Sequence, residues 1–309
     1  MKFDFTKEPG LFLWDRALKT EGKPLISIIT AFYNAGKHFE QTYNSVINQT
    51  FPWFEWIIVD DGSTDEFSLR LLDDVEKRDG RIKILHQENT GLSSSSRNSG
   101  IAISTTDLIF PLDADDIIEP TCLEYEYWAL LKNKDAAWAY SDSVGFQGQE
   151  YLWTEKFDAE EIKKRNLLTA TALIRKKAIL DAGGYSVREH HFNEDWHLWL
   201  KIIANGGYPV QITGEYLFWY RRSQTGVLSK VENDKNNREK NTKLIRNAAS
   251  FIINSKEPVI YPTNECRYFE GLHKSDWDGS IYKKHDKIHV LCLFPWLEMG
   301  GQISSIWIY

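Results

Sequence analysis

The sequence predicts an α/β fold: a Rossmann-like, mostly parallel central sheet with helices on both faces, followed by a helical or irregular C-terminal extension. Two observations lead to this prediction. Short apolar runs alternate with segments whose apolar residues recur at helical spacing, an order typical of strand–helix–strand units. Carboxylates also follow two of the apolar runs directly, at the position where open parallel sheets bind their ligands.

The first half of the chain shows this alternation most clearly. Apolar runs indicate buried strands, and a 3.6-residue apolar period indicates helices. Pro52 ends the first predicted helix, and Gly91 precedes the third. In chain order the sequence predicts a strand at 25–31, a helix with apolar positions at 39, 43, 46 and 47, a strand at 56–59, a helix marked by 67, 71 and 75, a strand at 82–85, a helix at 93–103 and a strand that runs into Asp113.

Beyond residue 120 the pattern becomes looser. Gly183-Gly184 indicates a tight turn, and an aromatic-rich helix is expected to begin just after Glu194-Asp195. A stretch rich in Lys, Asn, Glu and Arg at 230–246 indicates a solvated helix or a linker. The remaining predicted elements are a helix at 121–131 and strands at 137–141, 170–174, 210–212 and 216–220.

The composition is that of a globular chain, with 42% hydrophobic and 26% charged residues among 309. The net charge of −7 argues against a nucleic-acid partner, and 14% aromatic residues favour a site that stacks rings or sugars. The three separated cysteines suit a reducing compartment, and neither they nor His190-His191 have metal-ligand spacing. The chain shows no signal peptide and no apolar run of membrane length. We therefore expect a cytoplasmic location; peripheral contact with the inner face of a membrane and the oligomeric state are left open.

The most informative polar motif is Asp113-Ala114-Asp115-Asp116, which places three carboxylates within four positions after an apolar run. Anions this close repel one another, so the cluster requires water or a cation beside it. Oxygen ligands select hard ions such as Mg²⁺ or Mn²⁺, usually shared with substrate phosphates. A solvated acidic turn is the alternative, because Asp276-Trp277-Asp278 has the same Asp-x-Asp spacing with no strand before it.

Two further motifs lie where predicted strands meet helices. Asp60-Asp61-Gly62 follows the second strand, and a carboxylate there can accept hydrogen bonds from a base imide or a ribose hydroxyl. An ordinary turn with a helix cap explains it equally well. The run from Ser93 to Arg97 joins free helix N–H groups to one cation, which suits an anion. Taken alone, that run is more typical of a serine-rich helix cap.

Later polar residues offer weaker candidates. A carboxylate of Glu194 or Asp195 at the edge of a cleft could remove a proton from an attacking hydroxyl, whereas a helix-capping role is preferred for Glu194. Trp196, at its helical spacing, is more typical of a core than of a sugar platform. Arg221 or Arg222 could neutralise a diphosphate, with a surface salt bridge as the default for either.

In their order, these motifs closely resemble the family 2 glycosyltransferases with the GT-A fold. The resemblance covers roughly residues 24–229. It is carried by segments 24–34 (PLISIITAFYN), 48–50 (NQT), 58–65 (IVDDGSTD), 89–92 (NTGL), 97–100 (RNSG), 112–116 (LDADD), 183–185 (GGY), 194–200 (EDWHLWL) and 220–222 (YRR). So many ordered motifs make the assignment specific.

The resemblance implies roles for individual residues. Tyr33 and Asp61 are expected to hold uracil or another base, and Asp113 to face the ribose. Asp115, together with Asp113, is expected to bind Mn²⁺ or Mg²⁺. Asp195 matches the family's catalytic base. The full implied nucleotide-sugar set is Ala31, Tyr33, Asp60, Asp61, Arg97, Asp113, Ala114 and Asp115. Diphosphate or acceptor contacts are expected from Glu194, Trp196, Arg221 and Arg222.

The expected activity is therefore a metal-dependent, inverting sugar transfer. The donor would be a nucleotide-sugar, with a UDP-sugar as first choice, and the acceptor a hydroxyl of a glycan or glycoconjugate, as in polysaccharide synthesis. Asp195 would take the proton of the acceptor hydroxyl, which attacks the anomeric carbon opposite the leaving group. Two departures stand out: Ser223 replaces a His that is sometimes a metal ligand, and Ala31 replaces a frequent Pro.

The predicted domains are an N-terminal extension at 1–23, a GT-A domain at 24–229, a helical or linker extension at 230–285 and a final segment at 286–309. The final segment, with its strand-like run before Gly300-Gly301, resembles the first strand and loop of a GT-B glycosyltransferase. We expect a truncated start of a second enzyme there. A terminal strand or helix that packs on the first domain is the alternative.

Three other functions are alternatives to sugar transfer. A nucleotidyltransferase would need a glycine-rich loop with a Lys near the first strand, and 31–37 does not supply one. A phosphohydrolase with paired aspartates would carry them after its first strand rather than after a late one. A degenerate module that binds a nucleotide-sugar or glycan without turnover stays open, because of Ser223 and the unusual C-terminal segment.

Overall fold

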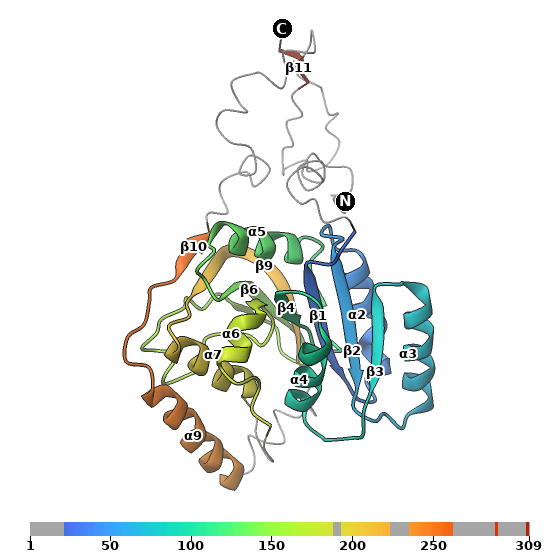
Figure 1. The fold of residues 1–309 in the computed structure, drawn as a ribbon. Coiled ribbons are helices and arrows are strands. Elements are labelled where there is room, and N and C mark those ends of the chain that lie inside the picture. Colours follow the sequence, from blue (N-terminus) through green and yellow to red (C-terminus); the bar gives the residue numbers. More distant parts are fainter. Residues whose placement is uncertain (1–21, 188–192, 223–234, 262–287, 290–306, 309) are drawn as a thin grey trace.

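A computed structural model describes residues 22–187, 193–222, 235–261, 288–289 and 307–308 (Figure 1). Within these ranges the chain forms one large mixed sheet with helices on both sides, and a separate pair of short strands. Ser223, His190, His191, Cys266 and Cys292 lie outside the described residues, as do residues 1–21 and most of the predicted C-terminal segment. The proposals for those segments stay predictions.

The large sheet contains ten strands. Their bounds are β1 (Ile26–Phe32), β2 (Phe54–Asp60), β3 (Ile82–His86), β4 (Leu108–Pro111), β5 (Ile117–Ile118), β6 (Trp138–Gln147), β7 (Tyr151–Trp153), β8 (Leu173–Arg175), β9 (Pro209–Arg222) and β10 (Val259–Tyr261). The separate pair consists of β11 (Ile288–His289) and β12 (Trp307–Ile308), which run antiparallel.

The described helices connect these strands. Their bounds are α2 (Gly36–Ile47), α3 (Glu66–Arg78), α4 (Ser93–Ile103), α5 (Cys122–Lys132), α6 (Lys176–Asp181), α7 (Glu194–Ala204) and α9 (Lys235–Ser250). The four predicted helices from α2 to α5 are confirmed within a few residues at each end, and α4 has the predicted bounds. None of the helices in this part of the chain is long and apolar enough to cross a membrane.

The main path of the sheet has the order β10-β9-β6-β8-β4-β1-β2-β3. On that path only β8 runs against its neighbours, so the predicted mostly parallel sheet is confirmed. Phe32 on β1 pairs with Asp60 on β2, and Asp60 pairs with His86 on β3. Because these strands end in register, the residues that follow them meet at one edge of the sheet.

Two hydrophobic cores cover the two faces of the sheet. On β2, Trp56 and Ile58 belong to one core, whereas Ile57 and Val59 belong to the other. This alternation follows from the two-residue period of a strand, and a strand buried on both faces is apolar throughout. Helices α2, α3 and α5 contribute side chains to the first core; α4, α7 and α9 contribute to the second. The prediction of helices on both faces is thus confirmed.

The C-terminal half departs from the prediction in its details. The two late strands form one strand, β9, whose pairing with β6 shifts register near Asp142. Gly214 permits this irregularity: its φ is +82°, and its N–H donates to Asp142 at 2.7 Å. Strands β5, β7 and β10 and helix α6 were not predicted. Helix α7 begins at Glu194, so Glu194 and Asp195 form its first turn rather than precede it.

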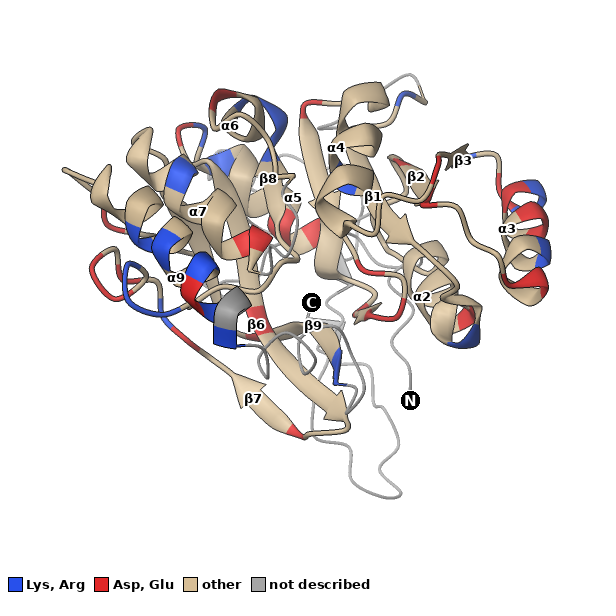
Figure 2. Cartoon of the chain, turned by 90° about the horizontal axis from the view of Figure 1, so that it is seen from below, with Lys and Arg blue, Asp and Glu red and all other residues tan. Residues whose placement is uncertain are grey.

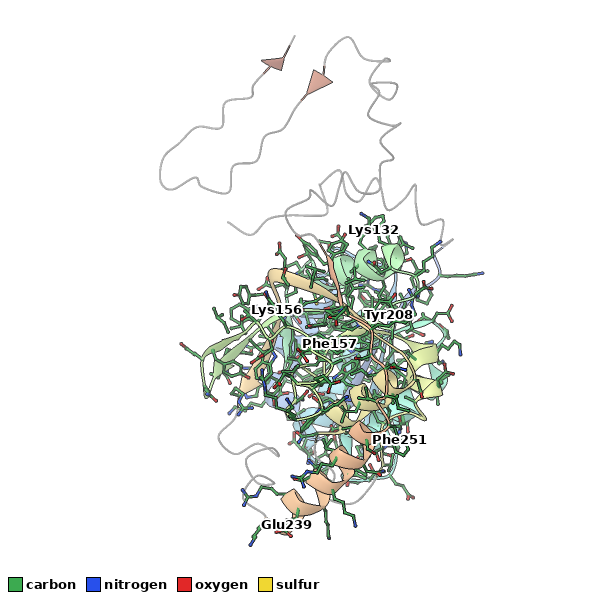
Figure 3. The ribbon with its side chains drawn as sticks, turned by 90° about the vertical axis from the view of Figure 1, so that its left-hand side faces the viewer. Lys132, Lys156, Phe157, Tyr208, Glu239 and Phe251 are labelled. Atoms are coloured by element: carbon green, nitrogen blue, oxygen red, sulfur yellow. The ribbon has the colours of Figure 1, made fainter. Side chains whose placement is uncertain are left out.

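The basic stretch expected to be a solvated helix or linker is a helix with one buried side. Ile245 and Ala248 of α9 are buried and belong to the same core as Leu198 of α7. Figure 3 shows α9 on the outside of the molecule, with Glu239 near one end and Phe251 just beyond the other. Cys122 on α5 is buried.

Candidate active site

A cavity of about 1190 Å³ lies at the edge of the sheet where β1, β2 and β4 end. Its volume is ample for a ligand larger than a typical drug. Figure 2 shows several acidic positions between α4 and α7. The predicted site residues that line it are Ala31, Tyr33, Asp61, Arg97, Asp113, Ala114, Asp115, Glu194, Asp195 and Arg222.

Three predicted site residues do not line this cavity. Asp60 is buried; it accepts the Ser63 N–H at 2.9 Å and contacts His86 at 2.9 Å, so it shapes the turn after β2. Trp196 donates its indole N–H to the carbonyl of Ile162 at 2.6 Å and packs against the second core. Arg221 is buried beneath the acidic loop described below.

Asp61 is enclosed by the loop that follows β3. Its carboxylate accepts hydrogen bonds from the Gln87 side chain at 2.6 Å, the Gly91 N–H at 3.0 Å and both the N–H and the hydroxyl of Thr90. Gly62 allows this close approach, because its φ is +71° and an added Cβ would lie 2.8 Å from the Asn89 nitrogen. The contacts explain why the Asp-Gly and Asn-Thr-Gly motifs occur together.

Arg97 on α4 joins two parts of the acidic wall. Its buried guanidinium donates to Asp113 at 2.6 Å and to Glu194 at 2.7 Å. Ser93 donates to the same Glu194 oxygen at 2.8 Å. Both terminal nitrogens of Arg97 thus donate to carboxylates. Burial acts to raise the pKa of Glu194, but Arg97 and Ser93 outweigh it and hold that pKa below its usual value.

The acidic loop at 113–116 is clamped from below by Arg221 of β9. The Arg221 N–H donates to Asp116 at 2.7 Å, and its Nε donates to the carbonyl of Asp115 at 2.5 Å. Its Nη2 reaches Gln41 on α2 at 2.7 Å. These contacts connect helix α2, the acidic loop and strand β9. Arg221 therefore positions the loop instead of lining the cavity.

The carboxylates of this loop are electrostatically strained. Burial and the neighbouring Asp113 raise the pKa of Asp115 to about 6. Burial, Asp113 and Asp115 raise the pKa of Asp116 well above its usual value. A nearby cation would relieve this strain, because an opposite charge favours the ionised form.

Asp195 stands at the start of α7, on the other side of the cavity. Burial, followed by repulsion from Glu194, raises its pKa to about 6. The side-chain amide of Asn166 donates to Asp195 at 3.1 Å, and the amide oxygen of Asn166 accepts the Leu168 N–H at 3.1 Å. The second bond fixes which end of the amide faces Asp195. Asn166 lies in the segment whose structure the sequence did not predict, and no motif marks it.

Strands β6 and β7 form the remaining wall, which the sequence did not foresee. Tyr151 and Trp153 of β7 line the cavity, and the Trp153 indole N–H is anchored on the carbonyl of Leu167 at 3.0 Å. The Tyr151 ring rests on Gly145 of β6, where a Cβ would lie 2.1 Å from the ring. Arg222 lines the cavity nearby. The only sequence signal in β7 is the pair of aromatic residues on either side of Leu152, and a run of three residues is too short to interpret.

The donor set at the acidic loop fits a hard divalent cation. Asp113 and Asp115 offer carboxylate oxygens to the cavity, and the described residues contain no group of three or more metal-ligating side chains. Within the described ranges, two side-chain ligands, those of Asp113 and Asp115, are therefore available to such an ion. That number suits Mg²⁺ or Mn²⁺, which keep several waters and share substrate phosphates.

Comparisons with known proteins place the chain among sugar-transferring enzymes. The sequence model described as glycosyl transferase family 2 matches residues 27–195. An uncharacterized glycosyltransferase of Methanocaldococcus jannaschii is 30% identical over 224 residues, which cover 69% of this chain and 76% of that protein. The glycosyltransferase GlyG of Streptococcus pneumoniae is 30% identical over 232 residues, covering 68% of this chain and 74% of GlyG.

Longer polysaccharide synthases and solved structures also match. The chondroitin synthase of Escherichia coli is 26% identical over 254 residues, covering 80% of this chain but 36% of the synthase. Residues 1–349 of S. aureus TarS, solved in complex with UDP-GlcNAc, superpose with a TM-score of 0.63 at 19% identity. That match covers 74% of this chain and 67% of the TarS chain. At this identity it shows a shared fold.

Proposed function

Because the chain belongs to glycosyl transferase family 2, we propose that it moves a sugar from a UDP-sugar to a hydroxyl of a glycan or glycoconjugate, with inversion at the anomeric carbon. The glycosyltransferase class and the GT-A fold are shown by the family match and by the solved structures. We propose in addition that the donor is a UDP-sugar, that the reaction depends on a divalent metal ion and that the anomeric centre is inverted.

One observation carries it. Asp61, Asp115 and Asp195 come from three distant parts of the chain, and all three line a single cavity. A protein that only needed surface carboxylates would have no reason to gather them, because each one adds to the repulsion among the others. Carboxylates that converge on one cavity are instead what acid–base chemistry and cation-assisted phosphate chemistry require.

On the donor side, Tyr33 and Asp61 offer a half-exposed ring and a fixed carboxylate to a base. We assign the uracil to this pair and the ribose to the neighbourhood of Asp113. The complex of TarS with UDP-GlcNAc supports a UDP-sugar in a related fold. Another nucleotide-sugar is the second choice, since a carboxylate can also accept hydrogen bonds from other bases.

The diphosphate would lie beside the acidic loop. Its negative charges would repel Asp113 and Asp115 unless a cation lay between them. Mn²⁺ or Mg²⁺ bound there would offset the charge that grows on the departing nucleoside diphosphate. Arg221 holds the loop in place through its contacts with Asp115 and Asp116.

Asp195 is assigned the role of general base. A pKa of about 6 leaves its carboxylate ionised at neutral pH, yet more basic than an ordinary aspartate. The Asn166 amide donates to one carboxylate oxygen of Asp195, and this carboxylate accepts the proton of the acceptor hydroxyl. The hydroxyl oxygen then bonds to the anomeric carbon as the bond to the diphosphate breaks. Glu194, paired with Arg97, stays ionised and structural.

Release of UDP from a panel of UDP-sugars, with Mn²⁺ or Mg²⁺ present, tests the proposal. We expect slow hydrolysis of one donor, faster release when a mixture of glycan acceptors is added, and loss of release on chelation. GDP- and dTDP-sugars serve as the control panel. If no donor is turned over while UDP still raises the melting temperature, the chain is a degenerate nucleotide-sugar binding module. If UDP has no effect either, the assignment of this cavity fails.

A further inference from the structure

Helix α9 and the turn after it carry a charge opposite to that of the whole chain. The net charge of the chain is −7. Between positions 235 and 256 the sequence contains one acidic residue, Glu239. The basic residues there are Lys235, Arg238, Lys240, Lys243, Arg246 and Lys256. Figure 2 shows the Lys and Arg positions along α9.

Most of the cations on α9 lie on the side of the helix that faces away from the protein. Ile245 and Ala248 are buried against the second core, with α7 as the packing partner of α9. Lys235, Lys243 and Arg246 are exposed, and the 3.6-residue helical period places them on the opposite side of the helix. None of the cations on α9 forms an ion pair with a described residue. Side chains of α9 project outward in Figure 3.

Two apolar side chains extend this surface. Phe251 is 64% exposed and Ile253 is 86% exposed, whereas Ile252 between them is buried. Both follow directly on the C-terminal end of α9. Large apolar side chains this exposed, next to a cluster of cations, indicate a surface that contacts something both anionic and apolar.

We propose that the basic face of α9, defined by Lys235, Lys240, Lys243, Arg246, Phe251 and Ile253, docks on an anionic phospholipid membrane. The cations would meet lipid head groups, and Phe251 and Ile253 would enter the interface below them. A nucleic acid would also attract the cations, but it gives no place for Ile253. Because α9 packs on α7, whose first turn lines the cavity, docking would hold Asp195 near the membrane surface.

Vesicle co-sedimentation of the full chain tests the proposal. One set of vesicles contains phosphatidylcholine alone, and the other contains phosphatidylcholine mixed with phosphatidylglycerol. We expect binding to the anionic vesicles only, weakened by salt. The combined variant Lys240→Glu, Lys243→Glu and Arg246→Glu should bind at least about tenfold more weakly. Phe251→Ser with Ile253→Ser should weaken binding several-fold and leave the salt dependence in place.

A matched control reverses three exposed cations elsewhere: Arg70→Glu, Lys77→Glu and Lys134→Glu. It changes the net charge equally and should keep full binding. Equal loss in the control would mean that net charge, not the face of α9, governs binding, and the proposal would fall. Binding of a labelled RNA by this face in the absence of vesicle binding, or no binding of the wild-type chain to either, would also overturn it.

Discussion

Asp61 and Asp115 line the same cavity, yet they lie in contrasting surroundings. Asp61 receives donors from Gln87, Thr90 and Gly91, so its charge is matched by hydrogen bonds made within the protein. Asp115 has the acidic Asp113 beside it, and burial and that neighbour raise its pKa to about 6. The Asp61 side of the cavity is therefore the satisfied side, because its carboxylate already accepts hydrogen bonds from the protein. The Asp115 side is the strained side, because its carboxylate lies next to another acid.

Under the proposed function, the contrast separates the recognition of the donor from the reaction. A carboxylate held by three neighbouring residues is rigid, and it can present fixed acceptors to a ligand at little cost. A strained carboxylate gains most when a proton or a cation arrives, which is what a catalytic wall requires. Asp195, with a pKa also raised to about 6, belongs with Asp115. The following changes test whether the two sides differ in this way.

Asp195→Asn should have the largest effect. The variant keeps the shape of the side chain and loses its basicity, so turnover at saturating donor should fall by roughly 10²–10⁴-fold. The melting temperature should not fall, because a buried charge is removed from beside Glu194. Initial rates and thermal unfolding measure both. Near-normal turnover with intact folding would exclude Asp195 as the base.

Asp115→Asn should stabilise the metal-free protein while it impairs turnover. The folded state holds this proton up to pH about 6, whereas the unfolded chain releases it near its usual value of 3.8. Stability contributed by the protonated form is therefore lost as pH rises between these values. Since Asp115 is partly exposed, we expect a gain of about 1–2 kcal/mol at pH 8. Chemical denaturation with a chelator present measures it.

The control for that experiment is Asp73→Asn, an exposed carboxylate on α3. It should leave the free energy of unfolding unchanged at pH 8. A metal-free Asp115→Asn protein that is no more stable than wild type would show that the acidic loop is not strained, and the contrast with Asp61 would disappear.

Thr90→Val probes the satisfied side of the cavity. It removes the hydroxyl that donates to Asp61 at 2.9 Å and keeps the size of the side chain. We expect about 1 kcal/mol weaker UDP binding, because the carboxylate is held less firmly. Titration calorimetry with UDP measures the affinity. An unchanged affinity together with a large loss of turnover would place Thr90 on the reaction side instead.

Asn166→Ala should give the smallest effect and the most specific one. The Asn166 amide favours the ionised form of Asp195, so its loss should raise the pKa of that carboxyl further. The acid limb of the kcat–pH profile should therefore move to higher pH, by a fraction of a unit. A lower kcat with an unmoved limb would contradict a positioning role for Asn166.

The sequence predicted the satisfied side of the cavity better than the strained side. An apolar run that ends in Asp60-Asp61 defines both a strand and its edge, and parallel neighbours must end there too. Even so, the sequence could not tell that Asp60 turns inward to Ser63 and His86 while Asp61 lines the cavity. That choice depends on the backbone of a single turn.

The contacts on the strained side of the cavity have no comparable pattern in the sequence. Asn166 meets Asp195 through an irregular segment, and the Arg221 N–H meets Asp116 across 105 positions. Neither contact creates a periodicity, and an Arg at a strand end is equally compatible with a surface salt bridge. Strand β7, with three residues, is shorter than any period can reveal. The aromatic wall formed by Tyr151 and Trp153 was therefore visible only in three dimensions.

A crystal structure with UDP and Mn²⁺ bound would test most directly whether one hollow serves both recognition and reaction. We predict electron density for the pyrimidine against Asp61 and Tyr33, and for the diphosphate beside Asp115. Asp195 should face the side of the β-phosphate to which the sugar of the donor is attached. A nucleotide bound in another hollow, or bound here with its base turned toward Asp195 and its phosphates toward Asp61, would contradict the account.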